Sequence, residues 1–160
     1  MAQIYIGLGS NVERESNLLA GIADLQACFT DVRLSTVYES AAVGFPGANF
    51  YNLVAEAQTT LSLPELLAAL RNIEFAHGRA PDARKFAPRT LDLDLLSFDK
   101  LVCLEPVVLP RAELLHNAFV LCPFAELAPD WIHPVAGQSL ALLWEQYDKS
   151  RQPLTPVRLF

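Results

Sequence analysis

The chain has 160 residues, of which 52% are hydrophobic and 19% charged, and its formal net charge is −6. This composition supplies a packed core and excludes an intrinsically disordered chain, which would combine low hydrophobicity with high charge. The negative charge argues against nonspecific binding along nucleic acid, because such binding depends on neutralising phosphates. With no low-complexity stretch, residues 1–160 are expected to form one domain.

The N-terminus and the cysteines favour a cytoplasmic protein. The first residues lack the basic and then apolar pattern of a secretory signal, and no run of eighteen apolar residues predicts a membrane span. Cys28, Cys103 and Cys122 are scattered in apolar surroundings, so we expect reduced, buried thiols.

Hydrophobic periodicity predicts the elements of the first part of the chain. An alternating apolar run from Ile4 to Leu8 predicts a buried strand that ends in a turn. Apolar residues at helical spacing predict an amphipathic helix over about residues 15–29. Alternation then predicts two strands, near residues 32–43 and 50–60.

A capping box opens the next predicted element. Ser62 is followed three residues later by Glu65 and by an apolar stripe, which predicts a helix that Gly78 is placed to end. An apolar run over residues 91–98 predicts the last clear strand.

Two short helices, over residues 119–127 and 140–147, are expected after this strand, separated by loops that contain proline. The order is therefore β-α-β-β-α-β followed by helices and loops. This order predicts the α+β class and a ferredoxin-like arrangement, in which helices pack on one face of an antiparallel sheet.

The strongest chemical signal is a carboxylate pair in the last predicted strand. Asp92 and Asp94 are two residues apart, so both project from the same face of a strand. Two carboxylates this close repel each other unless a cation lies between them. Oxygen ligands of this kind suit Mg²⁺, whereas the alternative is an edge strand with two solvated aspartates.

A basic stretch precedes the carboxylate pair. Residues 71–90 contain five arginines and lysines against two acidic residues, a local charge of +3. Arginine binds phosphate oxygens in pairs, and phosphoryl transfer combines such cations with a metal that bridges phosphates. Beside two aspartates, the stretch favours a site for a phosphorylated ligand over a merely solvated surface.

Several motifs together resemble the 6-hydroxymethyl-7,8-dihydropterin pyrophosphokinases of folate biosynthesis, and the resemblance covers nearly the whole chain. The most specific motif is Arg-Thr-Leu-Asp-Leu-Asp at residues 89–94. The others are Gly-Ser-Asn at 9–11, Phe-Tyr-Asn-Leu-Val at 50–54, Gly-Arg at 78–79, Phe-Val-Leu at 119–121 and Glu-Leu-Ala-Pro at 126–129.

The resemblance implies transfer of pyrophosphate from ATP to the hydroxymethyl group of 6-hydroxymethyl-7,8-dihydropterin, giving AMP and the pterin diphosphate. It implies two Mg²⁺ ions held by Asp92 and Asp94, with Arg79 and Arg89 as catalytic residues that hold phosphates. The further residues expected to bind ATP are Arg71, Glu74, Arg84, Lys85, Phe86 and Arg111.

The resemblance also implies a pterin pocket in which an amide reads the edge of a ring held between two aromatic faces. The residues expected to bind the pterin are Ser40, Val43, Phe50, Asn52 and Phe119. ATP and the pterin are the expected partners of a monomeric cytoplasmic enzyme that binds neither nucleic acid nor a membrane. The loops at 44–49 and 79–89 are expected to close over both substrates.

Departures from the family pattern leave two alternatives open. Arg111 stands where the family usually has histidine, and Glu113 and Asn117 stand at positions that are commonly basic. Phe86 replaces an expected tryptophan, and Ala41 and Ala42 replace prolines. One alternative is a divergent paralogue that acts on another heterocycle, and the other is a nucleotide- or pterin-binding module with low turnover.

Overall fold

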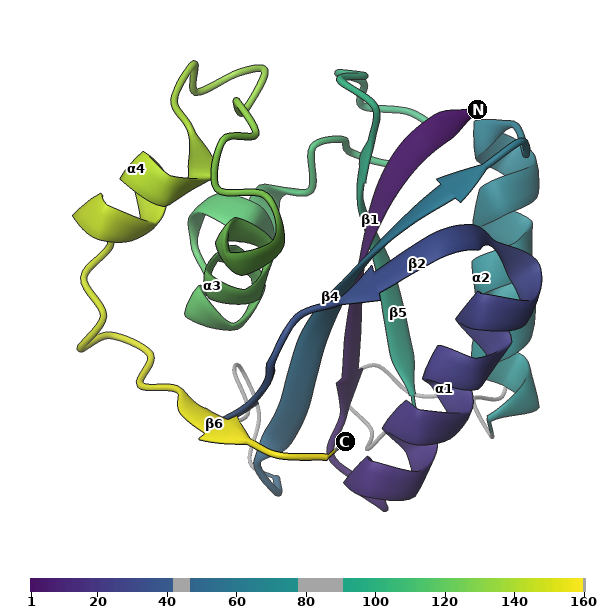
Figure 1. Cartoon of the computed structure of the whole chain (residues 1–160), viewed down its shortest axis with the longest axis horizontal. Coiled ribbons are helices and arrows are strands. Elements are labelled where there is room, and N and C mark those ends of the chain that lie inside the picture. Colours follow the sequence, from purple (N-terminus) through teal and green to yellow (C-terminus); the bar gives the residue numbers. More distant parts are fainter. Residues whose placement is uncertain (42–46, 78–90, 160) are drawn as a thin grey trace.

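The computed structural model describes residues 1–41, 47–77 and 91–159, and within these ranges one antiparallel sheet separates two helical layers (Figure 1). The helices α1 (Arg14–Cys28) and α2 (Leu63–Ala76) cover one face of the sheet. The helices α3 (Ala118–Leu127) and α4 (Leu140–Gln146) lie on the other face.

The sheet runs in the order β5-β1-β4-β3-β6, and β2 also pairs with β4. Its strands are β1 (Ala2–Ser10), β2 (Thr30–Leu34), β3 (Val37–Ser40), β4 (Phe50–Thr59), β5 (Asp92–Phe98) and β6 (Thr155–Val157). The expected α+β class and antiparallel sheet are confirmed. The sheet has two differences from the expected one: a break in its second strand and the added edge strand β6.

The break between β2 and β3 comes from side chains that replace the regular ladder. The Ser35 hydroxyl oxygen accepts a hydrogen bond from the Val54 backbone N–H at 2.9 Å. The Glu126 carboxylate of α3 accepts hydrogen bonds from the N–H and hydroxyl of Thr36 at 2.9 and 2.8 Å, and from the Tyr38 hydroxyl at 3.0 Å. A continuous strand over residues 32–43 was expected, but hydroxyl and carboxylate groups that compete for the backbone interrupt it.

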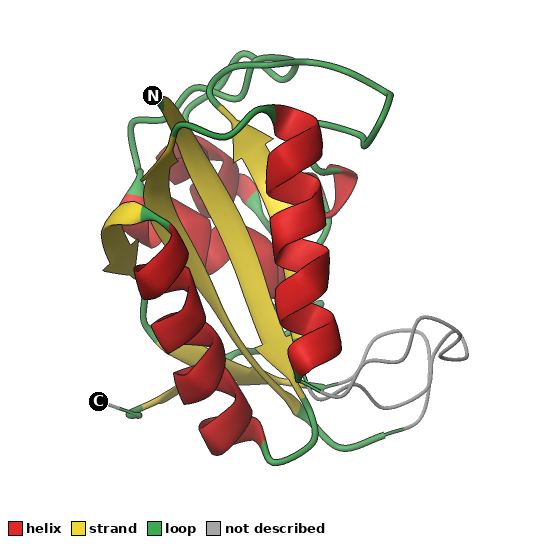
Figure 2. Ribbon diagram, turned by 90° about the vertical axis from the view of Figure 1, so that its right-hand side faces the viewer, coloured by secondary structure: helices red, strands yellow, loops and turns green. Residues whose placement is uncertain are grey.

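One apolar core lies between the sheet and the first two helices. Figure 2 shows α1 and α2 packed side by side over the strands. Ile4, Ile6 and Leu8 of β1 point into this core, where Leu18 and Leu66 of the helices are fully buried. The alternation in β1 therefore sends its even-numbered residues to this side.

A second, smaller core fills the other side of the sheet. Tyr5, Val54 and Leu96, one from each of three neighbouring strands, pack there against Phe124 of α3. The Tyr5 hydroxyl donates to the Glu56 carboxylate at 2.6 Å, and burial together with this bond raises its pKa. The helical additions after residue 98 thus cover a face of the sheet that α1 and α2 leave open.

The helix boundaries follow local chemistry closely. The capping box of α2 is present: the Ser62 hydroxyl accepts from the Glu65 N–H, and the Glu65 carboxylate accepts from the Ser62 N–H. The helix ends at Ala76, and Gly78, the expected stop signal, lies outside the described residues. A short 3₁₀ helix, η1 (Ala112–Leu115), precedes α3.

Two further expectations can be compared with the structure. Among the described residues, no helix has both the length and the apolar character needed to cross a bilayer. The expectation of a buried thiol is wrong for Cys28, which is exposed because its neighbour Phe29 takes the buried position at the end of α1. Cys103 and Cys122 are partly buried.

Candidate active site

A cavity of about 260 Å³ lies on the α3 side of the sheet, beyond the point where the second core ends. Side chains and backbone from four strands line it together with the segment that leads into α3. The lining residues are Gly7, Leu8, Gly9, Ser40, Ala41, Phe50, Asn52, Leu53, Asp92, Asp94, Leu96, Arg111, Glu113, Asn117, Phe119 and Val120.

Polar side chains reach the cavity because two strands, β4 and β5, change from apolar to polar residues along the same face. In β4, Val54 belongs to the core and Asn52, two residues earlier, lines the cavity. In β5 the same change takes place between Leu96 and Asp94. Since side chains on one face of a strand are two residues apart, the sequence itself fixes where the core stops and the cavity starts.

The register of β1 brings the polar groups into one row across the sheet. Gly9 lies opposite Asn52 of β4 on one side and opposite Asp92 of β5 on the other. Gly7, on the same face of β1, lies opposite Asp94. Two glycines therefore form the floor of the cavity, with an amide along one edge and two carboxylates along the other.

Gly9 leaves the space that the amide group of Asn52 occupies. A Cβ atom at Gly9 would lie 2.6 Å from the Asn52 Oδ1 atom, well inside van der Waals contact. Asn52 is 8% exposed, and its Nδ2 donates to the Ser40 hydroxyl oxygen at 3.1 Å. The missing side chain at Gly9 and the bond to Ser40 thus fix the orientation of an amide that faces the cavity.

The carboxylate edge of the cavity already has one cationic neighbour. The Arg111 Nη2 atom lies 3.4 Å from the Asp94 Oδ1 atom, and the Arg111 Nε donates to the Leu95 carbonyl at 3.3 Å. The Asp94 side chain is 60% exposed, which leaves its carboxylate accessible from the cavity.

The chemistry of this donor set fits Mg²⁺. Asp92 and Asp94 supply carboxylate oxygens, which hard cations prefer. No group of three or more histidine, cysteine, aspartate or glutamate side chains in the described ranges could hold a metal ion. A two-carboxylate site that leaves the remaining positions to water and phosphate oxygens is typical of Mg²⁺ bound together with a nucleotide.

Glu74 fixes the backbone between the two aspartates. It is 7% exposed, and its Oε2 atom accepts a hydrogen bond from the Leu93 N–H at 2.9 Å. Glu74 is not among the residues that line the cavity, and its expected contact with ATP stays a prediction. Its buried carboxylate, from α2, holds the part of β5 that carries Asp92 and Asp94.

The structure brings together seven of the residues predicted for the site. These residues line the same cavity: Ser40, Phe50, Asn52, Asp92, Asp94, Arg111 and Phe119. Arg71 is exposed on α2 and, like Glu74, is not among the lining residues. The other predicted residues lie outside the described ranges: Val43, Arg79, Arg84, Lys85, Phe86 and Arg89. The expected closing loops also fall largely there.

Sequence reasoning missed Gly7 and Gly9 as site residues. The available signal was their spacing: two glycines at i and i+2 leave one face of a buried strand without side chains. Glu113 and Asn117 were recognised only as departures from a family pattern, and both line the cavity.

Comparison with known proteins agrees with this geometry. Residues 5–129 match the family model described as 7,8-dihydro-6-hydroxymethylpterin-pyrophosphokinase (HPPK). A 2-amino-4-hydroxy-6-hydroxymethyldihydropteridine pyrophosphokinase of Synechocystis sp. is 38% identical over 147 residues, which are 89% of this chain and 75% of that protein. The enzyme of the same name from Aquifex aeolicus is 38% identical over 143 residues, 88% of this chain and 89% of that one.

Solved structures show the same fold. The HPPK-DHPS of Plasmodium falciparum superposes with a TM-score of 0.74 at 14% identity, over 91% of this chain. This chain spans 45% of that longer one. The family match and these relatives define an ATP-dependent transferase that acts on a small molecule. The chain belongs to the HPPK family.

The contact between Gly9 and Asn52 leads to a first prediction. In Gly9→Ala the new methyl group displaces the Asn52 amide from its bond to Ser40, because the amide is the movable partner. Calorimetric titration with 6-hydroxymethyl-7,8-dihydropterin should then show binding weaker by about tenfold or more, the loss of one or two oriented hydrogen bonds.

Gly7→Ala is the matched control. Its Cβ would lie 3.6 Å from the nearest atom, Cδ2 of Leu96, which is ordinary van der Waals contact. A methyl group on the same cavity floor should therefore weaken binding much less. Equal losses in the two variants would mean that Asn52 has no special role.

Proposed function

We propose that this chain transfers pyrophosphate from ATP to the hydroxymethyl group of 6-hydroxymethyl-7,8-dihydropterin and so makes AMP and the pterin diphosphate in folate synthesis. The observation that carries the proposal is the row Asn52–Gly9–Asp92, in which an amide and a carboxylate line one cavity; this arrangement supports reading of a heterocycle by the amide and binding of a metal by the carboxylate. Membership of the HPPK family supports the same reaction.

One end of the cavity suits the pterin. Phe50 and Phe119 line it from β4 and α3, and a flat heterocycle is well held between aromatic faces. Asn52 presents an amide with both donor and acceptor atoms to the ring edge, and Ser40 orients that amide. We assign these four residues, with Val43, to pterin binding.

The other end suits the triphosphate. We assign Asp92 and Asp94 to two Mg²⁺ ions, which when bound neutralise and orient phosphate oxygens. Arg111 lies beside Asp94 and supplies a permanent positive charge at the same edge. The ATP contacts proposed from the family resemblance are Arg71, Glu74, Arg84, Lys85 and Phe86, with Arg79 and Arg89 as catalytic residues.

The chemical balance of the reaction fixes what the chain must hold in place. The pterin hydroxyl oxygen forms a bond to the β-phosphorus of ATP, the bond from that phosphorus to the α–β bridging oxygen breaks, and AMP leaves as the hydroxyl proton is lost. Catalysis of this kind rests on positioning and charge stabilisation. The paired strands and the buried Glu74 supply positioning, and the arginines supply charge.

The partners proposed for the chain are ATP and the pterin, bound by a monomer in the cytoplasm. A divergent paralogue is the second candidate, because two residues that line the cavity depart from the family pattern. Phe50 stands where the family usually has tyrosine, and Ala41 stands where it commonly has proline. Such a paralogue would keep the transfer of pyrophosphate and act on a different hydroxymethyl heterocycle.

An assay of AMP production separates these candidates. Purified chain, ATP and Mg²⁺ should form AMP only when 6-hydroxymethyl-7,8-dihydropterin is added. AMP formation with another hydroxymethyl heterocycle but not with this pterin would favour the paralogue. Binding of both ligands without AMP would indicate a binding module and contradict the proposed reaction.

The carboxylate pair gives the second prediction. Asp92→Ala and Asp94→Ala should each lower turnover about 10³-fold or more, since metal charge stabilisation contributes several kcal/mol. The far-ultraviolet circular dichroism should stay that of the wild type, because Asp94 is exposed and Asp92 half-buried.

Asp130→Ala removes an exposed carboxylate outside the cavity and serves as the control. Its turnover should equal that of the wild type. The metal assignment would be wrong if either Asp92→Ala or Asp94→Ala kept activity within about tenfold of the wild type.

Arg111 gives the third prediction. Arg111→Ala should weaken ATP binding by about 1.5–3 kcal/mol, the contribution of a charge-assisted hydrogen bond, and leave pterin binding without nucleotide unchanged. Separate calorimetric titrations with ATP and with pterin measure the two effects. Arg151→Ala, which removes an exposed positive charge outside the cavity, is the control, and a loss equal to that control would reduce Arg111 to a general electrostatic effect.

A further inference from the structure

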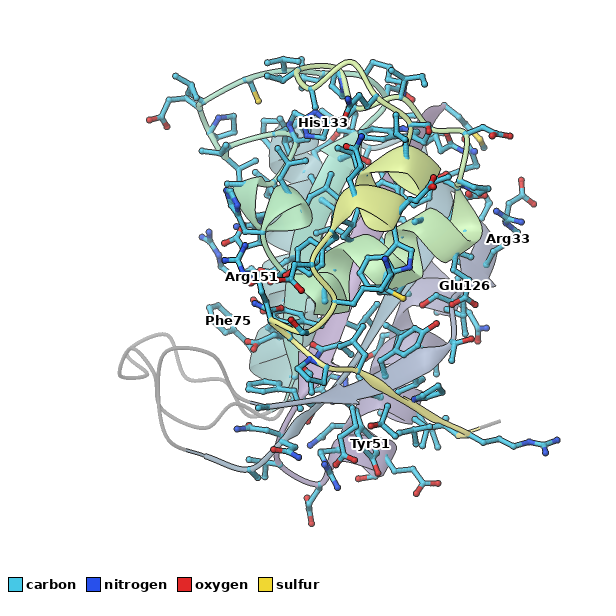
Figure 3. The ribbon with its side chains drawn as sticks, turned by 90° about the vertical axis from the view of Figure 1, so that its left-hand side faces the viewer. Arg33, Tyr51, Phe75, Glu126, His133 and Arg151 are labelled. Atoms are coloured by element: carbon cyan, nitrogen blue, oxygen red, sulfur yellow. The ribbon has the colours of Figure 1, made fainter. Side chains whose placement is uncertain are left out.

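The segment from Tyr147 to Val157, here called the C-terminal segment, lies against both walls of the pterin end of the cavity. Figure 3 shows it descending from α4, passing α3 and reaching the sheet. The family match ends at residue 129, so this segment lies outside the part of the chain that the family model describes.

Gln152 caps the helix that carries Phe119. Its Oε1 accepts a hydrogen bond from the Ala118 N–H at 2.8 Å, and its Nε2 donates to the Asn117 Oδ1 at 2.8 Å. Asn117 is the N-cap residue of α3 but makes no side-chain cap bond of its own. The amide of Gln152 thus accepts from the first N–H of α3, one of the N–H groups that have no partner within the helix.

The capped N–H group depends on this partner. Ala118 has no exposed surface, and a buried N–H without an acceptor is destabilising. Ala118 is the first residue of α3, and Phe119 follows it directly. The position of the Phe119 ring in the cavity is therefore coupled to a residue more than thirty positions later in the chain.

A second bond fixes the same region. The Tyr147 hydroxyl donates to the His116 carbonyl at 2.7 Å. Together the bonds of Tyr147 and Gln152 hold three consecutive residues, 116–118, immediately before Phe119.

The far end of the C-terminal segment holds the opposite wall. Thr155 and Val157 of β6 pair with Glu39 and Val37 of β3. Ser40, which orients the Asn52 amide, is the next residue of β3. One continuous segment thus bonds to the α3 wall and extends the sheet at the β3 wall.

We propose that the C-terminal segment sets the distance between the α3 wall and the β3 wall at the pterin end of the cavity. Gln152 is the positioning residue for Phe119. The proposal rests on the assignment of this end of the cavity to pterin under the proposed function. It goes further by giving a role to residues beyond the family match. A ring stacked between two walls loses contact when either wall shifts, because dispersion falls off steeply with distance.

The test compares two glutamine-to-methionine variants of the full-length chain. Gln152→Met keeps length and apolar bulk but removes both hydrogen bonds. Gln146→Met makes the same change at an exposed position at the end of α4. Calorimetry with 6-hydroxymethyl-7,8-dihydropterin should show about fivefold to tenfold weaker binding for Gln152→Met and no change for Gln146→Met. ATP affinity should be unchanged in both.

A third variant separates positioning from general loss of stability. Gln152→Glu keeps an acceptor for the Ala118 N–H, and a carboxylate is favoured at a helix N-terminus. The Asn117 amide can turn to donate its Nδ2 hydrogens to the new carboxylate. Pterin affinity of Gln152→Glu should therefore lie within about twofold of the wild type, less than half the free energy of one ordinary hydrogen bond.

Three results would overturn the proposal: unchanged pterin affinity in Gln152→Met, an equal loss of ATP affinity in that variant, or no recovery in Gln152→Glu. These results differ from a failure of the proposed reaction. A wild-type chain that binds pterin but forms no AMP contradicts the reaction, and the same titrations still decide the role of Gln152. A wild-type chain that binds no pterin contradicts both.

Discussion

The central strand β1 carries the constraint on which the rest of the site depends. It runs between β4 and β5, and its register places Gly9 between an amide and a carboxylate. The space at Gly9 holds the amide oxygen of Asn52, so any side chain there would push the amide away. Only a strand that is well paired on both sides can keep groups from two neighbours in such a fixed relation.

The two cores give that strand its rigidity. Ile4, Ile6 and Leu8 of β1 are buried under α1 and α2, whereas Tyr5 packs against α3 on the other side. Glu74 adds a buried carboxylate that binds the β5 backbone at Leu93, between the two aspartates. The strand that carries the two aspartates thus has its buried Leu93 N–H bonded from the opposite side of the sheet, by Glu74 of α2. Buried backbone N–H groups need such partners.

The wall formed by α3 is held by polar contacts at both ends of the helix in addition to the second core. Glu126 joins the far end of α3 to the break between β2 and β3, and Arg33 donates to the Leu127 carbonyl at 3.0 Å (Figure 3). Gln152 holds the near end of the same helix. Such bonds contribute about 1 kcal/mol each, so a single substitution at one end of α3 can shift that end while the second core keeps the helix on the sheet.

Much of this arrangement could be predicted from the sequence because it depends on residues only two or three positions apart. The spacing of Asp92 and Asp94 predicted a shared face, and the capping box at Ser62 predicted the start of α2. The break at Ser35 could not be predicted, because it depends on a hydroxyl that meets β4 and on a glutamate ninety residues away. The burial of Glu74 and the reach of Gln152 are also long-range contacts, which no local pattern encodes.

The most direct test of this account is a crystal structure with Mg²⁺, 6-hydroxymethyl-7,8-dihydropterin and an ATP analogue in which a methylene group replaces the α–β bridging oxygen. The account predicts the pterin ring between Phe50 and Phe119, the Asn52 amide on its edge, and metal ions bound to Asp92 and Asp94. A pterin bound elsewhere, or phosphates held without contact between metal and either aspartate, would contradict it.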